Sequence, residues 1–269
     1  MERSFDTPNG LTLDIKIPAG SIKVRAIDTA IAALRIEGER DPDDLRVDFS
    51  PTTGGAHRLG VEYRAKRAWG LFSFGNDLEI DVTVPIGSEV ACTVGSADIE
   101  IDGRVGSLVT RVGSGDVRFD VVGGDVTLKT GSGDIVGGTA TGDLTSHGAS
   151  GDLIVGRVGG SLVARSASGD LRIDEVGGPI QVTTVSGDLE IRSIDGPSAE
   201  LRTVSGDVGV GVPEGRGVYL DISSSSGDVR SDLDSAPSPE NGPDLELAVS
   251  TVSGDVHVRR ASRRSSESA

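Results

Sequence analysis

The sequence predicts an all-β fold: a single-stranded parallel β-solenoid with 18-residue, two-strand coils, capped at the N-terminus by irregular antiparallel β structure. A Ser-Gly-Asp or Ser-Ala-Asp triplet occurs nine times, and the first six copies are spaced 18 residues apart without exception. Short runs of alternating apolar and polar residues follow these triplets. The chain has 39 Gly in 269 residues and only 3% aromatic residues, and no stretch has sustained helical periodicity. A fixed period of this size is typical of stacked copies of one supersecondary unit.

Each 18-residue unit contains two short alternating strands and two turns. Val117–Phe119 and Ile180–Val182 are examples of the strands, whose period of two is typical of a half-buried β-strand. The turns alternate between a Ser-Gly-Asp type and a Val-Gly-Gly type, in which glycine supplies the backbone freedom that a tight turn needs. We therefore expect each coil to give one strand to each of two faces, with coils about 4.8 Å apart.

The apolar positions of these strands predict the core. The inward pairs are Val117/Phe119, Val126/Leu128, Leu153/Val155, Leu171/Ile173, Ile180/Val182 and Leu189/Ile191. One coil is poorer, because Ile135 and Leu144 are followed at the next inward positions by Gly137 and Ser146. We expect this coil to be thin, or to be locally out of register through Val136.

The pattern divides the chain into four parts. Residues 1–85 are expected to form an irregular β N-terminal cap and first coils, because an open solenoid end leaves strand edges unpaired. Residues 86–212 are the regular β-solenoid, and residues 213–258 are irregular last coils stretched by the loop at 236–243. Residues 259–269, rich in Arg and Ser, are expected to be a disordered tail.

Charge and composition exclude several classes of function. The net charge of −16 argues against nucleic acid, whose binding depends mainly on neutralising phosphates. The single cysteine, Cys92, excludes disulfides and cysteine-based metal sites, and its position predicts a buried side chain. The N-terminus lacks an apolar leader segment and no transmembrane segment is apparent, which predicts a cytoplasmic protein.

Several motifs resemble a known bacterial family. They are Phe5-Asp6-Thr7-Pro8, the Val-Pro-Ile-Gly-Ser turn at 84–88, the Ser-Gly-Asp coils, YLDISSSSGDVRSDL at 219–233 and STVSGDVHVRR at 250–260. This layout resembles the bacterial putative-adhesin β-strand-repeat family, also called the toast-rack domain. The resemblance covers nearly the whole chain and implies a β-solenoid of unknown function without known catalytic residues. It also implies a link to envelope-stress systems, near which some members occur.

The triplets place a column of aspartates along one edge of the stack. These residues are Asp98, Asp116, Asp134, Asp152, Asp170, Asp188, Asp207, Asp228 and Asp255. We interpret them as structural turn residues that bond their own turn backbone. The alternative is a calcium-binding repeat protein that uses the column. The pattern of this chain differs from the calcium-binding nonapeptide repeat G-G-x-G-x-D-x-U-x, because here Asp directly follows Gly.

An enzyme is the third interpretation, specifically a carbohydrate-active β-helix. His57, His147 and His257 are the only histidines and are scattered along the chain. Because Ser and Asp are so numerous, a Ser/His/Asp triad could be chosen by chance and is not evidence for catalysis. We predict no catalytic residue, cofactor or metal ligand.

One segment differs from the acidic, aromatic-poor remainder. It contains Arg64, Lys66, Arg67, Trp69, Phe72 and Phe74. It either plugs the first coil as part of a cap hairpin or forms an exposed contact tip for a protein or an anionic membrane surface. The sequence thus favours a non-enzymatic scaffold for protein or surface interaction, with an unknown protein partner or an anionic membrane surface and no nucleic acid.

Overall fold

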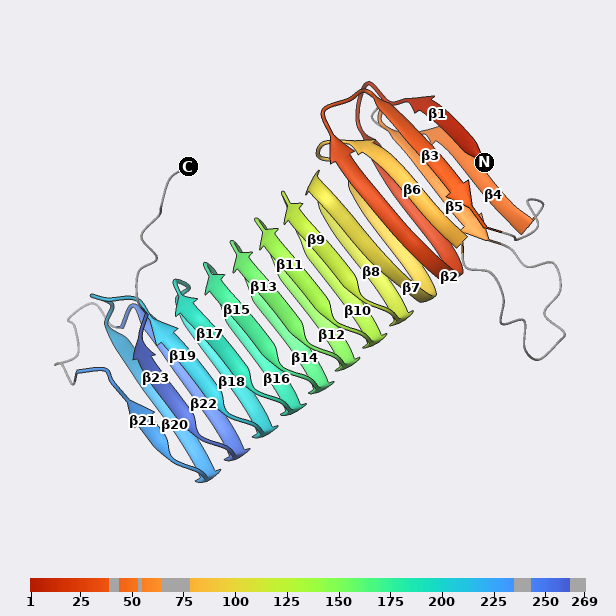
Figure 1. Ribbon diagram of the computed structural model, residues 1–269. Helices are drawn as coiled ribbons and strands as arrows, with labels where there is room; N and C mark the ends of the chain where they lie inside the picture. Colours follow the sequence, from red (N-terminus) through yellow and green to blue (C-terminus); the bar gives the residue numbers. More distant parts are fainter. Residues whose placement is uncertain (39–43, 53–54, 64–77, 235–242, 262–269) are drawn as a thin grey trace, which may run out of the picture. The chain divides into compact units, whose positions relative to one another are not determined.

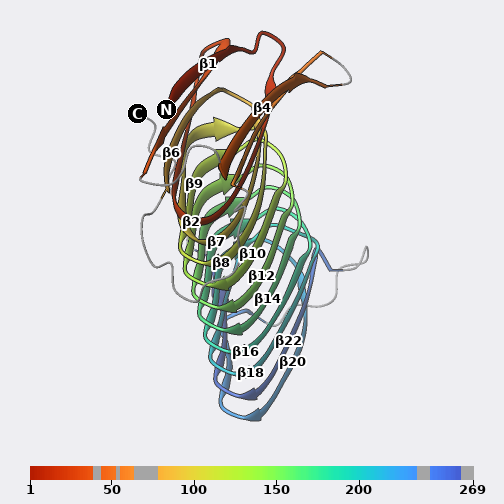
Figure 2. The same ribbon diagram turned by 90° about the vertical axis from the view of Figure 1, so that its right-hand side faces the viewer.

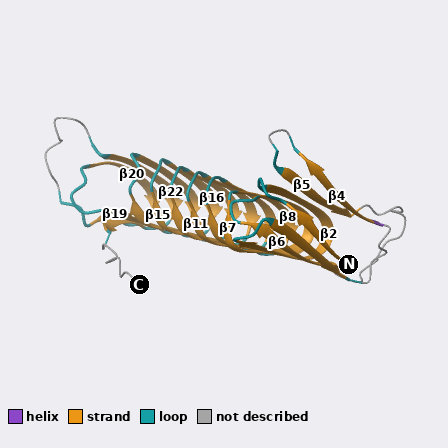
Figure 3. Cartoon of the chain, turned by 90° about the horizontal axis from the view of Figure 1, so that it is seen from above, coloured by secondary structure: helices purple, strands orange, loops and turns teal. Residues whose placement is uncertain are grey.

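A computed structural model describes residues 1–38, 44–52, 55–63, 78–234 and 243–261. The chain forms two compact units: an N-terminal unit, Met1–Ala140, and a C-terminal unit, Thr141–Ala269. The described residues form 23 strands and no α-helix. Strands, drawn in orange, predominate in Figure 3. Consequently, the described residues include no helix able to cross a membrane.

The regular part of the N-terminal unit is a stack of parallel strands (Figure 1). It contains β7 (Glu89–Val105), β8 (Ser107–Ser114), β9 (Val117–Val122), β10 (Val126–Ser132) and β11 (Ile135–Ala140). The first half of β7 pairs with β8, which pairs with β10. The second half of β7 pairs with β9, which pairs with β11. Partners differ by 18 residues, as in Val117 with Ile135, so each coil gives one strand to each face.

The beginning of the chain completes this unit out of sequence order. Its strands are β1 (Glu2–Asp6), β2 (Leu11–Ile27), β3 (Ile31–Glu37), β4 (Leu45–Pro51), β5 (His57–Tyr63) and β6 (Leu78–Pro85). Strand β2 lies parallel between β7 on one side and β5 and β6 on the other. Strand β3 pairs antiparallel with β6, β1 with β3, and β4 with β5. The predicted antiparallel N-terminal cap is therefore confirmed.

The C-terminal unit repeats the two-strand coil, visible as successive loops in Figure 2. One face contains β12 (Leu144–Ser150), β14 (Leu162–Ser168), β16 (Ile180–Ser186), β18 (Ser198–Ser205), β22 (Leu245–Ser253) and β20 (Val218–Ser226), in this spatial order. The other contains β13 (Leu153–Val158), β15 (Leu171–Val176), β17 (Leu189–Ile194), β19 (Val208–Val212), β23 (Val256–Arg260) and β21 (Val229–Ser231). The last coil along the chain thus lies next to last in space.

The core consists of the inward columns of these coils. All the inward pairs expected from the sequence are buried, and the valines of the Val-Gly-Gly turns, Val122, Val158 and Val176, add a third buried position. Burying an aliphatic side chain stabilises the fold by roughly 1.5–3 kcal/mol. The repeated inward aliphatic residues therefore supply the main favourable term for stacking the coils.

The thin coil keeps its register. Ile135 pairs with Val117 and Gly137 pairs with Phe119, whereas Val136 points outward and is exposed. A Cβ atom on Gly137 would lie 2.1 Å from Cζ of Phe119, so the phenyl ring occupies the space that a side chain would need. The expected slip through Val136 is therefore wrong, because a large residue in one coil compensates for the glycine in the next.

The strand ends differ slightly from the boundaries expected from the sequence. Strand β23 includes Arg259 and Arg260, which the sequence pattern places in the tail. Their backbones pair with Gly211 and Val212 of β19, and the Arg260 guanidinium donates to the carbonyl oxygen of Pro213 at 3.1 Å. These backbone and side-chain bonds extend the ordered strand two residues beyond the predicted boundary at 258.

Candidate functional site

The aspartates of the Ser-Gly-Asp turns are joined from coil to coil by hydrogen bonds. In the N-terminal unit, the backbone N–H of Asp116 donates to Oδ1 of Asp98 at 2.9 Å, and that of Asp134 donates to Oδ1 of Asp116 at 2.9 Å. The expectation that each Asp bonds its own turn is therefore wrong for these residues. The acceptor serves the next coil, because coils one strand spacing apart bring the next turn's N–H within reach.

We call this series of coil-to-coil hydrogen bonds the Asp ladder. In the C-terminal unit, the Asp ladder shows the order of the coils in space. Backbone N–H groups donate to the preceding Oδ1 from Asp170 to Asp152, Asp188 to Asp170, Asp207 to Asp188, Asp255 to Asp207 and Asp228 to Asp255, at 2.8–3.0 Å. Asp255 thus lies between Asp207 and Asp228, although it comes last in the sequence. Each bond satisfies one backbone donor at the turn, where no strand partner is available.

Glycine is required beside these aspartates for two reasons. Gly206 has a φ of 144°, a region that residues with a side chain rarely adopt. A Cβ atom there would also lie 2.1 Å from the carbonyl oxygen of Gly187 in the coil below. The glycine therefore permits both the turn and the close stacking that puts each Asp carboxylate under the next N–H.

Some aspartates of the column also form ion pairs along their own strand. Arg172 lies 2.9 Å from Oδ2 of Asp170, and Arg118 lies 3.3 Å from Oδ2 of Asp116. Exposed pairs of this kind contribute little to stability, about 0–1 kcal/mol. Within the described part of the chain, Asp188, Asp207 and Asp255 form no such pair. The middle of the C-terminal column therefore carries negative charge that no arginine neutralises directly.

A stripe of exposed valines runs beside this acidic column. Val185, Val204 and Val252 are 51%, 48% and 53% exposed and lie at the ends of β16, β18 and β22. Ser186 pairs with Ser205, and Ser205 with Ser253, so the valines directly before these serines occupy neighbouring coils. We call these three residues the valine stripe. It is a regular apolar surface bordered by serines and aspartates.

Sequence reasoning missed the valine stripe, although a signal was present. The residue two positions before the turn glycine is Gly in the early coils (Gly113, Gly131), Ala in the middle coils (Ala149, Ala167) and Val in three of the four late ones (Val185, Val204, Val252), whereas the coil of β20 has Ser225 there. The alternation made Val185 an outward residue. Only the stacking order revealed that the three valines are adjacent, because β22 follows β18 in space.

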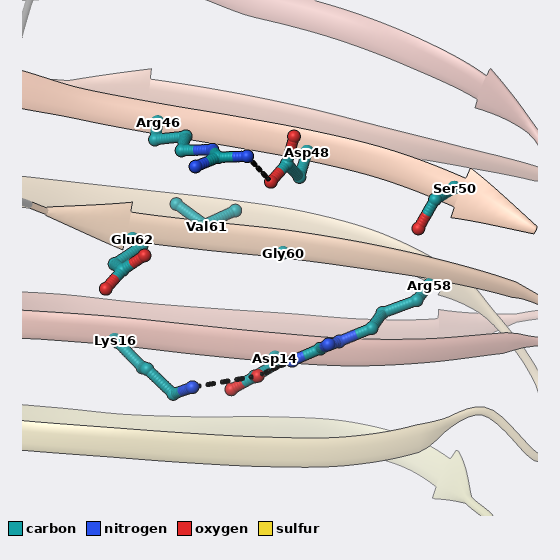
Figure 4. Close-up of a pocket in the computed structure, with 9 residues that line it drawn as sticks. All are labelled: Asp14, Lys16, Arg46, Asp48, Ser50, Arg58, Gly60, Val61 and Glu62. Atoms are coloured by element: carbon teal, nitrogen blue, oxygen red, sulfur yellow. Dashed lines mark hydrogen bonds and ion pairs between the residues drawn. The ribbon is translucent and has the colours of Figure 1, made fainter. Parts of the chain in front are cut away.

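The N-terminal unit contains a polar groove on the outer surface of β2, β4 and β5, drawn in Figure 4. Its volume is about 370 Å³, and Gly60 forms its floor between Asp14 and Asp48, its partners in register. Asp14 accepts from Arg58 and lies 3.2 Å from Lys16, while Arg46 lies 2.7 Å from Asp48.

The charges of this groove balance one another. Three cationic residues (Lys16, Arg46, Arg58) face three acidic ones (Asp14, Asp48, Glu62), and the lining includes neither histidine nor cysteine. The arrangement can hold water and small polar groups but offers no nucleophile paired with a base. The groove exists because glycine leaves space at a position where antiparallel β4 meets β5.

The histidines and the cysteine occupy separate environments. His57 stacks on Phe49 with ring centroids 4.9 Å apart, and Nε2 of His257 lies 2.9 Å from Oδ2 of Asp232. His147 lies on β12. Burial, with a smaller contribution from Asp14, raises the pKa of the Cys92 thiol to about 12, so the thiol is protonated at neutral pH. The described residues contain no group of three or more His, Cys, Asp and Glu suited to a metal ion.

A similar hydrogen bond between coils lies at the opposite edge, at the turn that precedes β12. Oδ1 of Asp143 accepts from the backbone N–H of Ser161 at 2.7 Å. This bond, together with one from the Ser161 side chain, holds the pKa of Asp143 below its usual value. At this turn, too, a carboxylate bonds the backbone of the next coil.

The predicted contact segment lies outside the described residues. This applies to Arg64, Lys66, Arg67, Trp69, Phe72 and Phe74, which belong to the stretch 64–77. The two interpretations of this segment, cap plug or contact tip, both stay predictions.

The chain was also compared with known proteins. Solved structures of similar chains include a putative adhesin from Parabacteroides distasonis ATCC 8503 (10% identity, 97% of this chain and 96% of that one, TM-score 0.42) and a putative adhesin from Bacteroides fragilis NCTC 9343 (13% identity, 96% of both chains, TM-score 0.38). A putative cell adhesion protein from Clostridium sporogenes ATCC 15579 is also similar (8% identity, 97% and 99%, TM-score 0.28). None of the curated proteins matches the chain.

The family model covers almost the entire repeat. The model described as Toastrack DUF4097 matches residues 12–259, which include all nine aspartates of the column and almost all of the strands that lie out of sequence order, β2, β22 and β23. Of the motifs on which the sequence resemblance depended, Phe5-Asp6-Thr7-Pro8 lies outside this match, whereas the turn at 84–88, the Ser-Gly-Asp coils and all but the last residue of the closing segment at 250–260 lie inside it. The chain therefore belongs to the Toastrack DUF4097 family.

Proposed function

We propose that the chain is a non-catalytic β-solenoid scaffold that binds a protein partner along the valine stripe of its C-terminal unit. The observation that carries the proposal is the exposure of Val185, Val204 and Val252 at about half of each side chain, at the same position of three neighbouring coils. Contiguous exposed apolar residues rimmed by polar ones are typical of interaction sites.

The residues beside the stripe indicate the chemistry of the partner. Asp188, Asp207 and Asp255 lie three residues after the valines, and no described cation pairs with them. The whole chain carries a net charge of −16. A partner segment that combines apolar side chains with Lys or Arg would complement both features, since complementary charge guides association and excludes acidic competitors.

Rigidity supports the same proposal. The valines stand on strands whose flanking turns are bonded coil to coil through the Asp ladder, with N–H to Oδ1 distances of 2.9 Å for Asp207 and 2.8 Å for Asp255. A surface that is already ordered loses little conformational entropy on binding. The coils therefore present a preformed strip to a partner.

The other candidate functions have less support. An anionic membrane surface would be repelled by the acidic column. The basic residues that could attract such a surface, Arg64, Lys66 and Arg67, lie outside the described residues. A calcium-binding repeat would need carboxylate oxygens, one of which in each interior Asp already accepts a backbone N–H. A carbohydrate-active enzyme would need an acid and a base in a cleft, whereas the charges of the Gly60 groove are mutually paired. A cytoplasmic location and a link to envelope stress stay predictions.

The proposal is tested with a photo-crosslinking amino acid placed at Val204 in the native bacterium. A matched control carries the same amino acid at Ile154, another exposed apolar residue of the C-terminal unit, on β13. We expect one defined protein to crosslink at residue 204 and not at residue 154. The triple change of Val185, Val204 and Val252 to Ser should abolish that adduct, tested with the crosslinker moved to Ser205, while leaving the melting temperature nearly unchanged.

Two results would contradict the proposal. One is the same set of adducts at both positions, which would indicate non-specific exposure. The other is an adduct that persists in the triple Ser variant, which would place the partner elsewhere. A specific adduct weakened by added salt would in addition support a basic partner, because screening reduces attraction between exposed charges.

A further inference from the structure

The last coil of the C-terminal unit has an incompletely covered core. On β20, the inward residues Val218, Leu220 and Ile222 are half-buried. Their partners in the neighbouring coil, Leu245, Leu247 and Val249, are no more than 2% exposed. The same position therefore changes from buried to half-buried over a single coil, because β20 has a paired strand on only one side among the described residues.

The outer edge of β20 also lacks the features that usually protect an edge strand. In the N-terminal unit, the outer strand β4 ends at Pro51 and carries the Arg46–Asp48 ion pair. Such charges and prolines discourage pairing with another chain. By contrast, β20 reads VYLDISSSS, with Asp221 as its single charge and no proline over nine residues.

The sequence that follows the terminal coil does not have the pattern of another strand. The segment 235–242 contains Pro237 and Pro239, which lack the backbone donor that a strand ladder needs. Its single aliphatic residue is Ala236, so it also lacks the alternating apolar pattern of β20. The chemistry that fits the edge is therefore another strand with the pattern of β20 itself.

We propose that two copies of the chain join through β20, paired antiparallel across a two-fold axis. In the favoured register, Leu220 lies opposite Leu220 of the partner subunit. Val218 then lies opposite the partner's Ile222, and Tyr219 opposite the partner's Asp221. A two-fold axis midway between the two copies of β20 makes the contact self-complementary and closed, so it gives a dimer and not a filament.

Side-chain direction and charge select this register. Inward residues must meet inward residues, because a shift by one position would turn the apolar set to the outside. The next allowed register is centred on Asp221, which would place it directly opposite Asp221 of the partner subunit and would put Val218 opposite a serine. Like charges in a directly opposed pair are destabilising. The register centred on Leu220 avoids this contact and joins all three apolar residues.

The first experiment measures the mass of the full chain by sedimentation over a wide range of concentrations. The wild type should form a dimer. Tyr219 is 61% exposed, so Tyr219→Asp should fold normally. It should nevertheless raise the dimer dissociation constant about tenfold or more, because it creates two opposed Asp–Asp pairs per dimer. Adding Asp221→Lys to Tyr219→Asp should restore dimerisation through two Asp–Lys pairs.

A control and a crosslink fix the site and the register. Ile154→Asp adds the same charge to an inner strand and should leave the dimer unchanged. Leu220→Cys should form an intersubunit disulfide readily, since directly opposed Cβ atoms lie about 4.5–5.5 Å apart. Tyr219→Cys should not, because it faces Asp221 of the partner subunit. The native Cys92 is buried and does not interfere.

The proposal fails if the chain is monomeric at every concentration, or if its dimer is insensitive to Tyr219→Asp. It also fails if a heterologous strand from another protein, and not a second copy, occupies the edge of β20. The register alone fails if Tyr219→Cys crosslinks and Leu220→Cys does not. These readouts do not involve the valine stripe, so the dimer and the partner-binding function can fail separately.

Discussion

The two ends of the repeat are built by different means. At the start of the N-terminal unit, antiparallel strands β1, β3 and β4 cover the first coils, and Phe5 and Phe49 meet with ring centroids 4.8 Å apart. At the end of the C-terminal unit, the last described coil presents half-buried Leu220 and Ile222. One end is closed by its own chain, whereas the other offers a strand edge. The interior coils are covered on both sides, so residues at either end can be compared with the same positions in an interior coil.

The first prediction compares the same residue type in adjacent coils. Leu247 is 1% exposed, and its partner Leu220 in the terminal coil is half-buried. Leu247→Ala should lower the free energy of unfolding by roughly 2–5 kcal/mol, because it leaves a cavity. Leu220→Ala, measured at a concentration where the protein is monomeric, should lower it by about 1 kcal/mol, since less area leaves the core. Urea unfolding measures both, and equal losses would show that the terminal coil is covered.

The second prediction compares two turn glycines with positive φ. Gly206 has carbonyl oxygen of the neighbouring coil in the space of a Cβ atom, whereas Gly215, at φ 80° before the terminal coil, has open space there. Gly206→Ala should destabilise by about 2–3 kcal/mol through backbone strain plus the clash. Gly215→Ala should cost about 1 kcal/mol, from strain alone. If the two variants melt at the same temperature, close stacking does not constrain the turn.

How far the sequence determines this architecture depends on the range of the contacts. The 18-residue period predicted the interior coils and their inward pairs, because partners such as Val117 and Ile135 are one period apart. Strand β2, however, pairs with β7 across 77 residues, and Asp255 bonds Asp207 across 48. Such pairings leave no periodic signal, because every coil has a similar apolar pattern. The placement of β2 and of β22 out of sequence order, and with it the adjacency of Val204 and Val252, therefore emerged only from the fold.

The candidate sites, too, could be predicted only where they depend on contacts within the repeat. The Asp column was evident from the triplets, but its hydrogen-bond partner was not. A turn residue can bond its own loop or the next one, and only the stacking distance decides between them. The Gly60 groove depends on an antiparallel strand, β4, whose register no repeat encodes. The compensation of Gly137 by Phe119 likewise requires knowing that these residues face each other.

The third prediction compares an interior aspartate with the terminal one. Asp170 accepts the N–H of Asp188 at 3.0 Å, so Asp170→Ala should cost on the order of 1 kcal/mol through the lost hydrogen bond. Asp170→Asn should cost less, because its amide oxygen can accept the same N–H. Asp228 lies in the terminal coil, where its side chain is 72% exposed. Asp228→Ala should be nearly neutral in thermal unfolding, and a loss equal to that of Asp170→Ala would contradict the ladder's direction.

The smallest expected effect is that of calcium. Neighbouring carboxylates about 4.8 Å apart repel by roughly 0.9 kcal/mol at the dielectric constant of water, so a divalent cation could in principle bind between them. In the interior coils, however, one oxygen of each carboxylate is already bonded to a backbone N–H. The melting temperature should therefore be nearly the same in millimolar calcium and in chelator. Sodium chloride is added to match the ionic strength, because screening alone relieves part of the repulsion.

A ligand that binds only the folded state must stabilise it, so a rise of about ten degrees specific to calcium would restore the calcium-binding interpretation. If that rise disappeared in Asp228→Ala alone, the bound ion would lie at the terminal coil and the interior ladder would still be structural.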